Sequence, residues 1–179
     1  MIAGAGDNTN CYLASRVPEK MGGKASQMAK AILLYSPWQF LYWYDRPEAS
    51  PHKKGGAGAA QGIIQDDENL DFYDQLPVVW EETKVLEGIF GEYATIARHQ
   101  EGTWYLGTLT AKVSREVNIP LSFLDKDQKY LAKIYFQDKV DLASNEIQTE
   151  EISVSRDMVL SRTVPANGGV AIVIRAEGR

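Results

Sequence analysis

The stretch YATIARHQEGTWYLGTLT, residues 93–110, decides the fold of this chain. Tyr93–Arg98 and Thr103–Thr110 are short segments rich in aromatic and β-branched residues, a composition typical of strands. Between them lies Gln100-Glu101-Gly102, and glycine suits the positive φ that a tight turn requires. We therefore predict a β-hairpin at this point of the chain.

Strand signals continue toward the C-terminus, and the hydrophobic period is two from Val78 onward. Pro120 predicts an edge strand or a bulge, and Asn167-Gly168-Gly169 predicts the turn into the last strand. The further strands expected are 116–123, 130–136, 147–155, 158–164 and 170–174. At least six strands without an intervening helix indicate an antiparallel β-sandwich.

The chain upstream of Val78 has a different hydrophobic pattern, which predicts helices as well as a strand. Residues 23–35 predict a helix that ends at Ser36-Pro37, with Lys24, Gln27 and Lys30 on its polar side. The aromatic stretch 38–44, WQFLYWY, is typical of a strand buried on both faces. Residues 1–22 are expected to be loop, 46–68 a surface insertion, and Asp71–Leu76 a short helix.

A helix followed by a buried strand is the grammar of an α/β unit with parallel strands. One such unit leaves free strand edges and an uncovered apolar face, so residues 1–77 are expected to need a larger α/β domain. Residues 78–179 are long enough to bury a core of their own. The expected fold class is therefore mainly β, with a C-terminal sandwich after the end of an α/β domain.

Composition excludes several classes of function. The net charge of −5 argues against a nucleic-acid binder. The single cysteine, Cys11, rules out an internal disulfide and a cysteine-based zinc site. No apolar run approaches the length of roughly 20 residues that spans a membrane. We expect no signal peptide on this chain, since its N-terminus lacks a basic region followed by an apolar one.

Several stretches, taken in order, resemble the C-terminal third of glycoside hydrolase family 97. AGAGDNTNCYLASRV resembles the family's Ala-Gly-x-Gly/Met-Asp-Tyr-Thr loop, with Asn8 in place of the tyrosine. In KASQMAKAILLYSPWQFLYWYDRP, Ser26 stands where the family helix has histidine. The other matching stretches are LPVVWEETKVLEGIFGEYATIAR at 76–98, WYLGTLT at 104–110, PLSFL at 120–124 and PANGGVAIVI at 165–174.

The resemblance implies an architecture and an activity. Family members have an N-terminal β-sandwich, a (β/α)8 barrel and a C-terminal β-sandwich. Residues 1–77 would be the end of an incomplete barrel, with 38–44 as its eighth strand, and 78–179 the C-terminal sandwich. Members hydrolyse α-linked glucosides or galactosides, hold calcium at the site and are commonly periplasmic or secreted. Their catalytic acids and calcium-binding glutamates lie upstream, so no catalytic or metal-binding residue carries over, and the chain alone is expected to be inactive.

Asp45 is the best candidate for contact with substrate, because it follows the presumed eighth strand at the end where barrel active sites lie. Trp43 and Tyr44 would offer aromatic surface to a sugar ring, and Asp7 follows the presumed seventh strand. The alternative is that Asp45 pairs with Arg46 or caps a turn, and that the two aromatic residues belong to the core.

Glycoside hydrolysis requires two carboxyl groups that face one pocket. Glu81-Glu82 and Glu150-Glu151 are adjacent pairs whose members point to opposite faces of a strand, and Asp66-Asp67-Glu68 suits a solvated surface. His52 and His99, which have no ligand spacing, are expected at the surface.

Two other functions stay open. One is a non-catalytic carbohydrate-binding or interaction module, although Trp80 and Trp104, the tryptophans of the sandwich, are expected in the core. The other is a chain that completes a split barrel by docking on a partner that supplies the rest.

Overall fold

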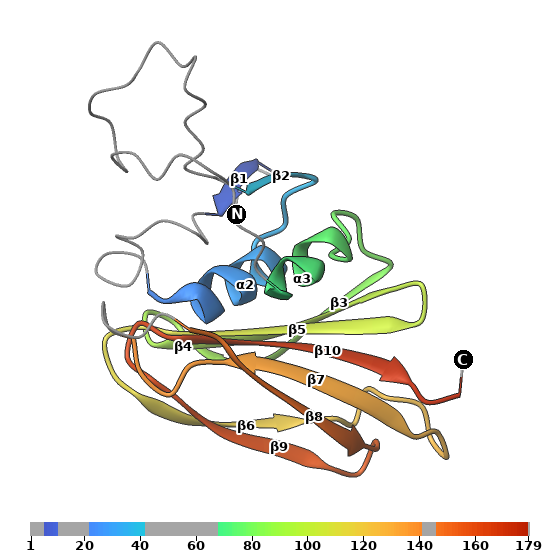
Figure 1. The fold of residues 1–179 in the computed structure, drawn as a ribbon. Coiled ribbons are helices and arrows are strands. Elements are labelled where there is room, and N and C mark those ends of the chain that lie inside the picture. The colour runs from blue at the N-terminus through green and yellow to red at the C-terminus, as the bar shows by residue number, and fades with distance from the viewer. Residues whose placement is uncertain (1–5, 11–21, 42–67, 141–145, 179) are drawn as a thin grey trace, which may run out of the picture.

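The computed structural model describes residues 6–10, 22–41, 68–140 and 146–178. These residues form four layers: a two-stranded sheet, a layer of helices, a six-stranded sheet and a second two-stranded sheet (Figure 1). The upper elements are β1 Asp7–Asn10, α2 Lys24–Leu33, β2 Trp38–Leu41, the 3-10 helix η1 Glu68–Leu70 and α3 Asp71–Asp74. The sandwich strands are β3 Glu82–Ile89, β4 Tyr93–Gln100, β5 Thr103–Thr110, β6 Arg115–Pro120, β7 Tyr130–Phe136, β8 Gln148–Val154, β9 Val159–Val164 and β10 Gly169–Ala176.

The large sheet has the strand order β3-β4-β5-β10-β7-β8, and every neighbouring pair is antiparallel. β6 and β9 form the antiparallel sheet that faces it, so the predicted antiparallel sandwich is confirmed. The β4–β5 hairpin is closed by Glu101 at φ 47° and Gly102 at φ 77°, as the predicted turn requires. Asn167 at φ 53° lies in the turn before β10.

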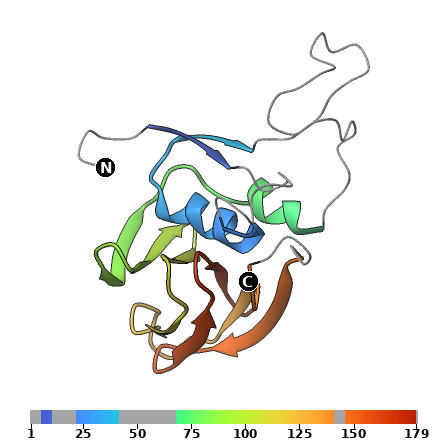
Figure 2. The same ribbon diagram turned by 90° about the vertical axis from the view of Figure 1, so that its left-hand side faces the viewer.

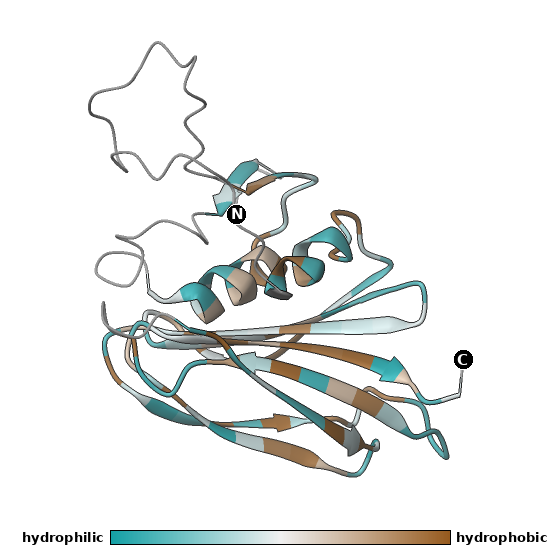
Figure 3. Cartoon of the chain, in the orientation of Figure 1, coloured by the Kyte–Doolittle hydropathy of each residue, from teal (hydrophilic) through white to brown (hydrophobic). Residues whose placement is uncertain are grey.

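The main core lies between the large sheet and the β6–β9 sheet. Every second residue of a strand points into it, as Ala132 and Ile134 of β7 do. Figure 3 shows hydrophobic bands along the same strand. The fully buried side chains of this core include Leu106, Val117, Leu121, Leu124 and Ile174. The partner strands pair in register over almost their whole length, so the sandwich buries a continuous core.

A second core lies on the opposite face of the large sheet, beneath α2 and α3 (Figure 2). It is formed by Met28, Ile32, Phe72, Tyr105, Tyr135, Ala171 and Val173. The helix Lys24–Leu33 is therefore covered on one side by the sheet and on the other by the β1–β2 layer. This burial extends to Gln27, at 1% exposure, so the expectation that Gln27 lies on a solvent-facing side was wrong.

β1 and β2 pair in parallel, with Asp7 opposite Trp38 and Asn10 opposite Leu41. Together with α2 they make a β-α-β unit, the repeat from which (β/α) barrels are built. Residues 7–10 were expected to be loop, and this prediction was wrong because they form the strand β1. The sequence Asp-Asn-Thr-Asn lacks strand-forming residues, and its pairing depends on hydrogen bonds rather than on apolar burial. The assignment of residues 1–77 to a barrel stays a prediction.

Candidate functional site

The C-terminal end of α2 is held by an arginine of the sandwich. Arg98, in β4, donates from Nε to the carbonyl oxygen of Ile32 at 2.6 Å and from Nη2 to that of Leu33 at 3.1 Å. Nη1 donates to Thr83 Oγ1 at 3.1 Å, so all three nitrogens have acceptors. The last carbonyls of a helix lack partners within it and carry partial negative charge. The guanidinium donates hydrogen bonds to these carbonyls, and its positive charge offsets their partial negative charge.

Burial gives this arginine an unusual environment. The residue is only 5% exposed, and its guanidinium carbon lies 5.6 Å from the ring centres of Tyr35 and Trp80. Desolvation lowers the pKa of Arg98, and the electrostatic influence of Tyr35 opposes that change. The arginine remains protonated and binds two aromatic faces as well as the helix. The sequence did not predict this role. Its only signal is that the charged Arg98 shares one face of the strand with the apolar residues Ala94 and Ile96.

The N-terminal end of α2 is also held by the sandwich. The backbone N–H of Ala25 donates to Gln137 Oε1 at 3.0 Å, and Ser26 Oγ donates to the carbonyl oxygen of Asn167 at 3.0 Å. Gly23, at the N-cap, supplies no side chain of its own. Gln137, which directly follows β7, therefore takes the place of a local capping residue. Both ends of the helix thus depend on side chains from distant parts of the sandwich.

Between its ends, the helix lies unusually close to the sheet. A Cβ at Gly107 of β5 would lie 2.6 Å from the carbonyl oxygen of Ala29 and 2.4 Å from Leu33 Cδ1. A Cβ at Gly169 of β10 would lie 2.7 Å from the Cα of Ser26. Both glycines are needed because a side chain at either position would push the helix away from the sheet.

Amide side chains join α2 to the layer above it. Gln39 of β2 donates from Nε2 to the carbonyl oxygen of Ala31 at 2.9 Å. Its Oε1 accepts from Asn10 Nδ2 at 3.1 Å and from Asn8 Nδ2 at 3.4 Å. Buried amides paired in this way fix the position of β1 and β2 on the helix. The asparagine in place of the family tyrosine, Asn8, thus belongs to this layer.

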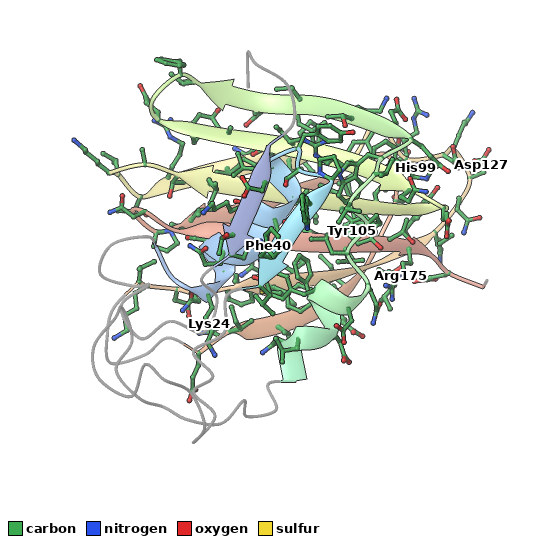
Figure 4. The ribbon with its side chains drawn as sticks, turned by 90° about the horizontal axis from the view of Figure 1, so that it is seen from above. Lys24, Phe40, His99, Tyr105, Asp127 and Arg175 are labelled. Atoms are coloured by element: carbon green, nitrogen blue, oxygen red, sulfur yellow. The ribbon has the colours of Figure 1, made fainter. Side chains whose placement is uncertain are left out.

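The opposite face of β2 carries exposed aromatic rings. Trp38 is 68% exposed, and Phe40, which is labelled in Figure 4, is 44% exposed. Their ring centres lie 5.6 Å apart. The prediction that this strand is buried on both faces was wrong for Trp38–Leu41 in this chain. Helix α2 covers one face only, and no described element covers the other.

Of the residues predicted to lie near the substrate, the structure describes only Asp7. Asp45, Trp43 and Tyr44 lie outside the described residues, as does His52, and their roles stay predictions. Asp7 is exposed at the start of a strand rather than in a loop after one.

The adjacent acidic pairs bind basic side chains. Glu81 contacts His99 Nδ1 at 3.0 Å, Glu82 pairs with Lys84, and Glu150 pairs with Arg162. His99 is partly buried against the ring of Trp104, so its expected surface position is only partly correct.

Two carboxylates do share one small hollow, of about 170 Å³, beside α3. Asp71 and Glu151 line it, together with the basic side chains of Lys133 and Arg175. Figure 4 shows Arg175 and Tyr105 near α3. Both carboxylates are exposed to solvent, whereas the general acid of a glycosidase is kept in an apolar environment. The hollow therefore lacks the environment of a hydrolytic site.

The described residues contain neither a metal-binding cluster nor a membrane-spanning helix. Among the described residues, no three histidine, cysteine, aspartate or glutamate side chains gather where they would bind a metal ion. No helix in the same residues is long and apolar enough to cross a membrane.

The tryptophans of the sandwich do not form an open platform. Trp104 is 7% exposed and lies in the main core, as predicted. Trp80 is partly buried, with its ring centre 5.4 Å from that of Tyr105. Its Nε1 is buried and has no hydrogen-bond acceptor among the described residues.

Exposed apolar side chains gather instead at the edge of the large sheet. Val85 and Ile89 of β3 are 74% and 46% exposed, and Phe90, in the turn after β3, is fully exposed. Beside them lies an open, mostly apolar hollow of about 610 Å³. An exposed apolar patch of this kind is typical of a surface at which proteins associate.

Comparison with known proteins shows the family of this chain. The family described as "Glycosyl-hydrolase 97 C-terminal, oligomerisation" matches residues 79–175. The chain belongs to this family. A retaining α-galactosidase of Bacteroides thetaiotaomicron is 28% identical over 168 residues, which cover 93% of this chain and 23% of the relative. A probable retaining α-galactosidase of Streptomyces bingchenggensis is 38% identical over 50 residues, 28% of this chain and 8% of the relative.

Solved structures share the fold of this family 97 chain. A family 97 enzyme of Pseudoalteromonas sp. strain K8, solved with acarbose, gives a TM-score of 0.67 at 23% identity over 86% of this chain. A β-arabinopyranosidase gives 0.62 at 23% identity over 84% of this chain. The chain spans 22% and 21% of these two structures, and about a quarter or less of the curated relatives.

Proposed function

We propose that this chain is the assembly module of a family 97 glycoside hydrolase that acts on α-linked glucosides or galactosides, and that it does not turn over substrate alone. The observation that carries the proposal is the match of residues 79–175 to a domain described by oligomerisation. The retaining α-galactosidases among its relatives support an α-linked substrate for the whole enzyme.

The arrangement of charges supports the second half of the proposal. Retaining hydrolysis requires carboxyl groups about 5 Å apart, and inversion requires about 6.5–9.5 Å. The paired acids Glu81, Glu82 and Glu150 each contact a basic side chain in the described part of the chain. The acids and the calcium ion of the parent enzyme would come from other residues.

The exposed face of β2 supports docking onto the rest of a barrel. Trp38 and Phe40 offer apolar surface, and β1 and β2 each pair with one described neighbour only. Further barrel strands, from the same polypeptide or from a partner chain, would cover the rings and extend the sheet. The role of α2 is then to join the barrel to the sandwich.

Two measurements on the 179-residue chain test the proposal. Incubation with p-nitrophenyl α-glucoside and α-galactoside in calcium should give no turnover above that of a boiled sample. Sedimentation at rising protein concentration should show reversible self-association. Turnover that survives repeated purification, or a chain that remains monomeric at every concentration, would contradict the corresponding half of the proposal.

Carbohydrate binding without catalysis is the second candidate, and the exposed Trp38–Phe40 pair is the observation that favours it. Aromatic rings stack on sugar faces, but the two rings are inclined at 34° to each other rather than coplanar. Affinity electrophoresis in gels containing α-glucan or α-galactan tests this role. Retardation that is lost in Trp38→Ala would establish it, and unchanged mobility would exclude it.

A further inference from the structure

The edge of the large sheet combines a projection and a hollow on one surface. Phe90 projects fully exposed from the β3–β4 turn, between Ile89 and Gly91. Phe90 forms one side of an open hollow, whose other lining residues include Val85, Ile96 and Leu109, together with Leu33 from the end of α2. Val85 and Ile96 are opposite each other in the β3–β4 ladder. Both features belong to one continuous apolar surface, which we call the β3 surface.

The rim of the β3 surface carries both signs of charge. Glu87 and Glu92 line the hollow, and Arg115 pairs with Glu92 while its guanidinium lies 4.7 Å from the ring centre of Tyr93. Lys112, which is exposed, follows the lining residue Ala111. A surface with both signs at its rim can match a rotated copy of itself, because each acid can meet a base.

The strand at this edge is also incomplete. β3 pairs with β4 alone in the described part of the chain, so its other side presents backbone groups to solvent. The ladder is irregular between Val85 and Glu87. Such a bulge discourages the open-ended pairing of strand edges that leads to aggregation. A closed association through side chains is therefore better suited to this edge than an extended sheet.

We propose that two copies of this chain associate about a two-fold axis through the β3 surface, with Phe90 of each copy in the hollow of the other. A two-fold interface uses the same patch on both subunits, so the patch must contain both a projection and its recess. This inference rests on the proposed assembly function and names its surface. The patch lies, apart from Leu33, within the segment matched to the oligomerisation domain.

The alternative surface for self-association is the aromatic face of β2. The two are distinguished by substitutions that leave the monomer core unchanged. Val85→Glu places a charge in the β3 surface, and Trp38→Glu places one on β2. Val159→Glu is the matched control, because Val159 is also an exposed strand valine, at 54%, but it lies on β9 in the other sheet.

Analytical ultracentrifugation of the full chain and these variants provides the test. Val85→Glu and Phe90→Glu should each raise the dissociation constant of the dimer at least roughly tenfold, as expected for a residue at the centre of an interface. Trp38→Glu and Val159→Glu should change it less than about threefold. Circular dichroism of each variant shows whether its fold is retained.

A photo-crosslinking amino acid at position 90 gives an independent result that does not depend on stability. In a mixture of ¹⁵N-labelled and unlabelled chains, mixed-isotope crosslinks should join position 90 to segments 85–96 or 109–111. A dimer that persists in Val85→Glu and Phe90→Glu, or that is lost in Trp38→Glu, would overturn this surface while the assembly function stands. A chain that never dimerises would overturn both.

Discussion

The Nε atom of Arg98 lies 2.6 Å from the carbonyl oxygen of Ile32, and this contact joins the sandwich to the helix that precedes it by 66 positions. The same guanidinium reaches Leu33 and the side chain of Thr83. If the two parts separated, the helix end would lose the guanidinium, and Arg98 would lose two of its three hydrogen-bond acceptors. The sandwich and the β-α-β unit are therefore expected to unfold together.

Replacement of Arg98 by methionine should lower the free energy of unfolding by about 2–4 kcal/mol, because buried carbonyls lose a charged donor. Arg98→Lys should recover only part of this loss, since an ammonium group lacks the planar fork. Urea denaturation followed by tryptophan fluorescence measures both. Equal stability of the methionine variant and the natural protein would show that the contact is not structural.

Gly107→Ala should cost about 1–3 kcal/mol, because the added methyl would lie 2.4 Å from Leu33 Cδ1 and 2.6 Å from the carbonyl oxygen of Ala29. Gly88→Ala, in the edge strand of the same sheet, is the control, since its nearest contact would be Tyr93 O at 3.2 Å. Thermal melts should rank Gly107→Ala well below Gly88→Ala. The reverse order would refute the close approach of α2.

Gln137→Ala should lower stability by about 1 kcal/mol, because the backbone N–H of Ala25 would lose its acceptor at the start of a helix. Gln148→Ala serves as the comparison, since Gln148 makes an exposed hydrogen bond to Asp138 at 2.8 Å. Hydrogen exchange of the Ala25 amide should accelerate in the first variant alone. Unchanged exchange there would show that Gln137 does not cap the helix.

Stability should fall as the pH rises above 10.0, the ordinary pKa of tyrosine, because the pKa of Tyr105 is raised by burial. The positive charge of Arg175 opposes that shift. The folded chain keeps this proton to higher pH than the unfolded chain, so alkali favours unfolding. Chemical denaturation from pH 9 upward should show a shallower decline in Tyr105→Phe than in the natural protein. Parallel declines would contradict the assignment.

Much of the sandwich was predictable because its strands obey local rules. The β4–β5 hairpin follows from alternating residues around Glu101-Gly102, and β7 was predicted at its observed bounds, Tyr130–Phe136. β3 was not predicted, because none of its residues is fully buried and the irregularity between Val85 and Glu87 disrupts the period of two. An edge strand of this kind has no apolar signature.

The candidate surfaces were harder to predict because they depend on distant partners. No spacing rule connects Ala25 with Gln137 or Ile32 with Arg98, so the capping of α2 required the structure. Gln27 resembles a surface residue until a second layer covers the helix. The assignment of the chain to family 97 was confirmed. The resemblance assigned no catalytic residue to this chain, and the candidate substrate contacts Trp43, Tyr44 and Asp45 lie outside the described residues.

The long separations between α2 and its partners have a consequence for biosynthesis. The helix leaves the ribosome well before its partners, because Gln137 follows Ala25 by 112 positions and Asn167 follows Ser26 by 141. A ten-residue helix is too short to persist in water without tertiary contacts. The nascent chain must therefore carry an incompletely packed helix segment until Asn167 has emerged, and chaperones that bind such segments can reach it until then.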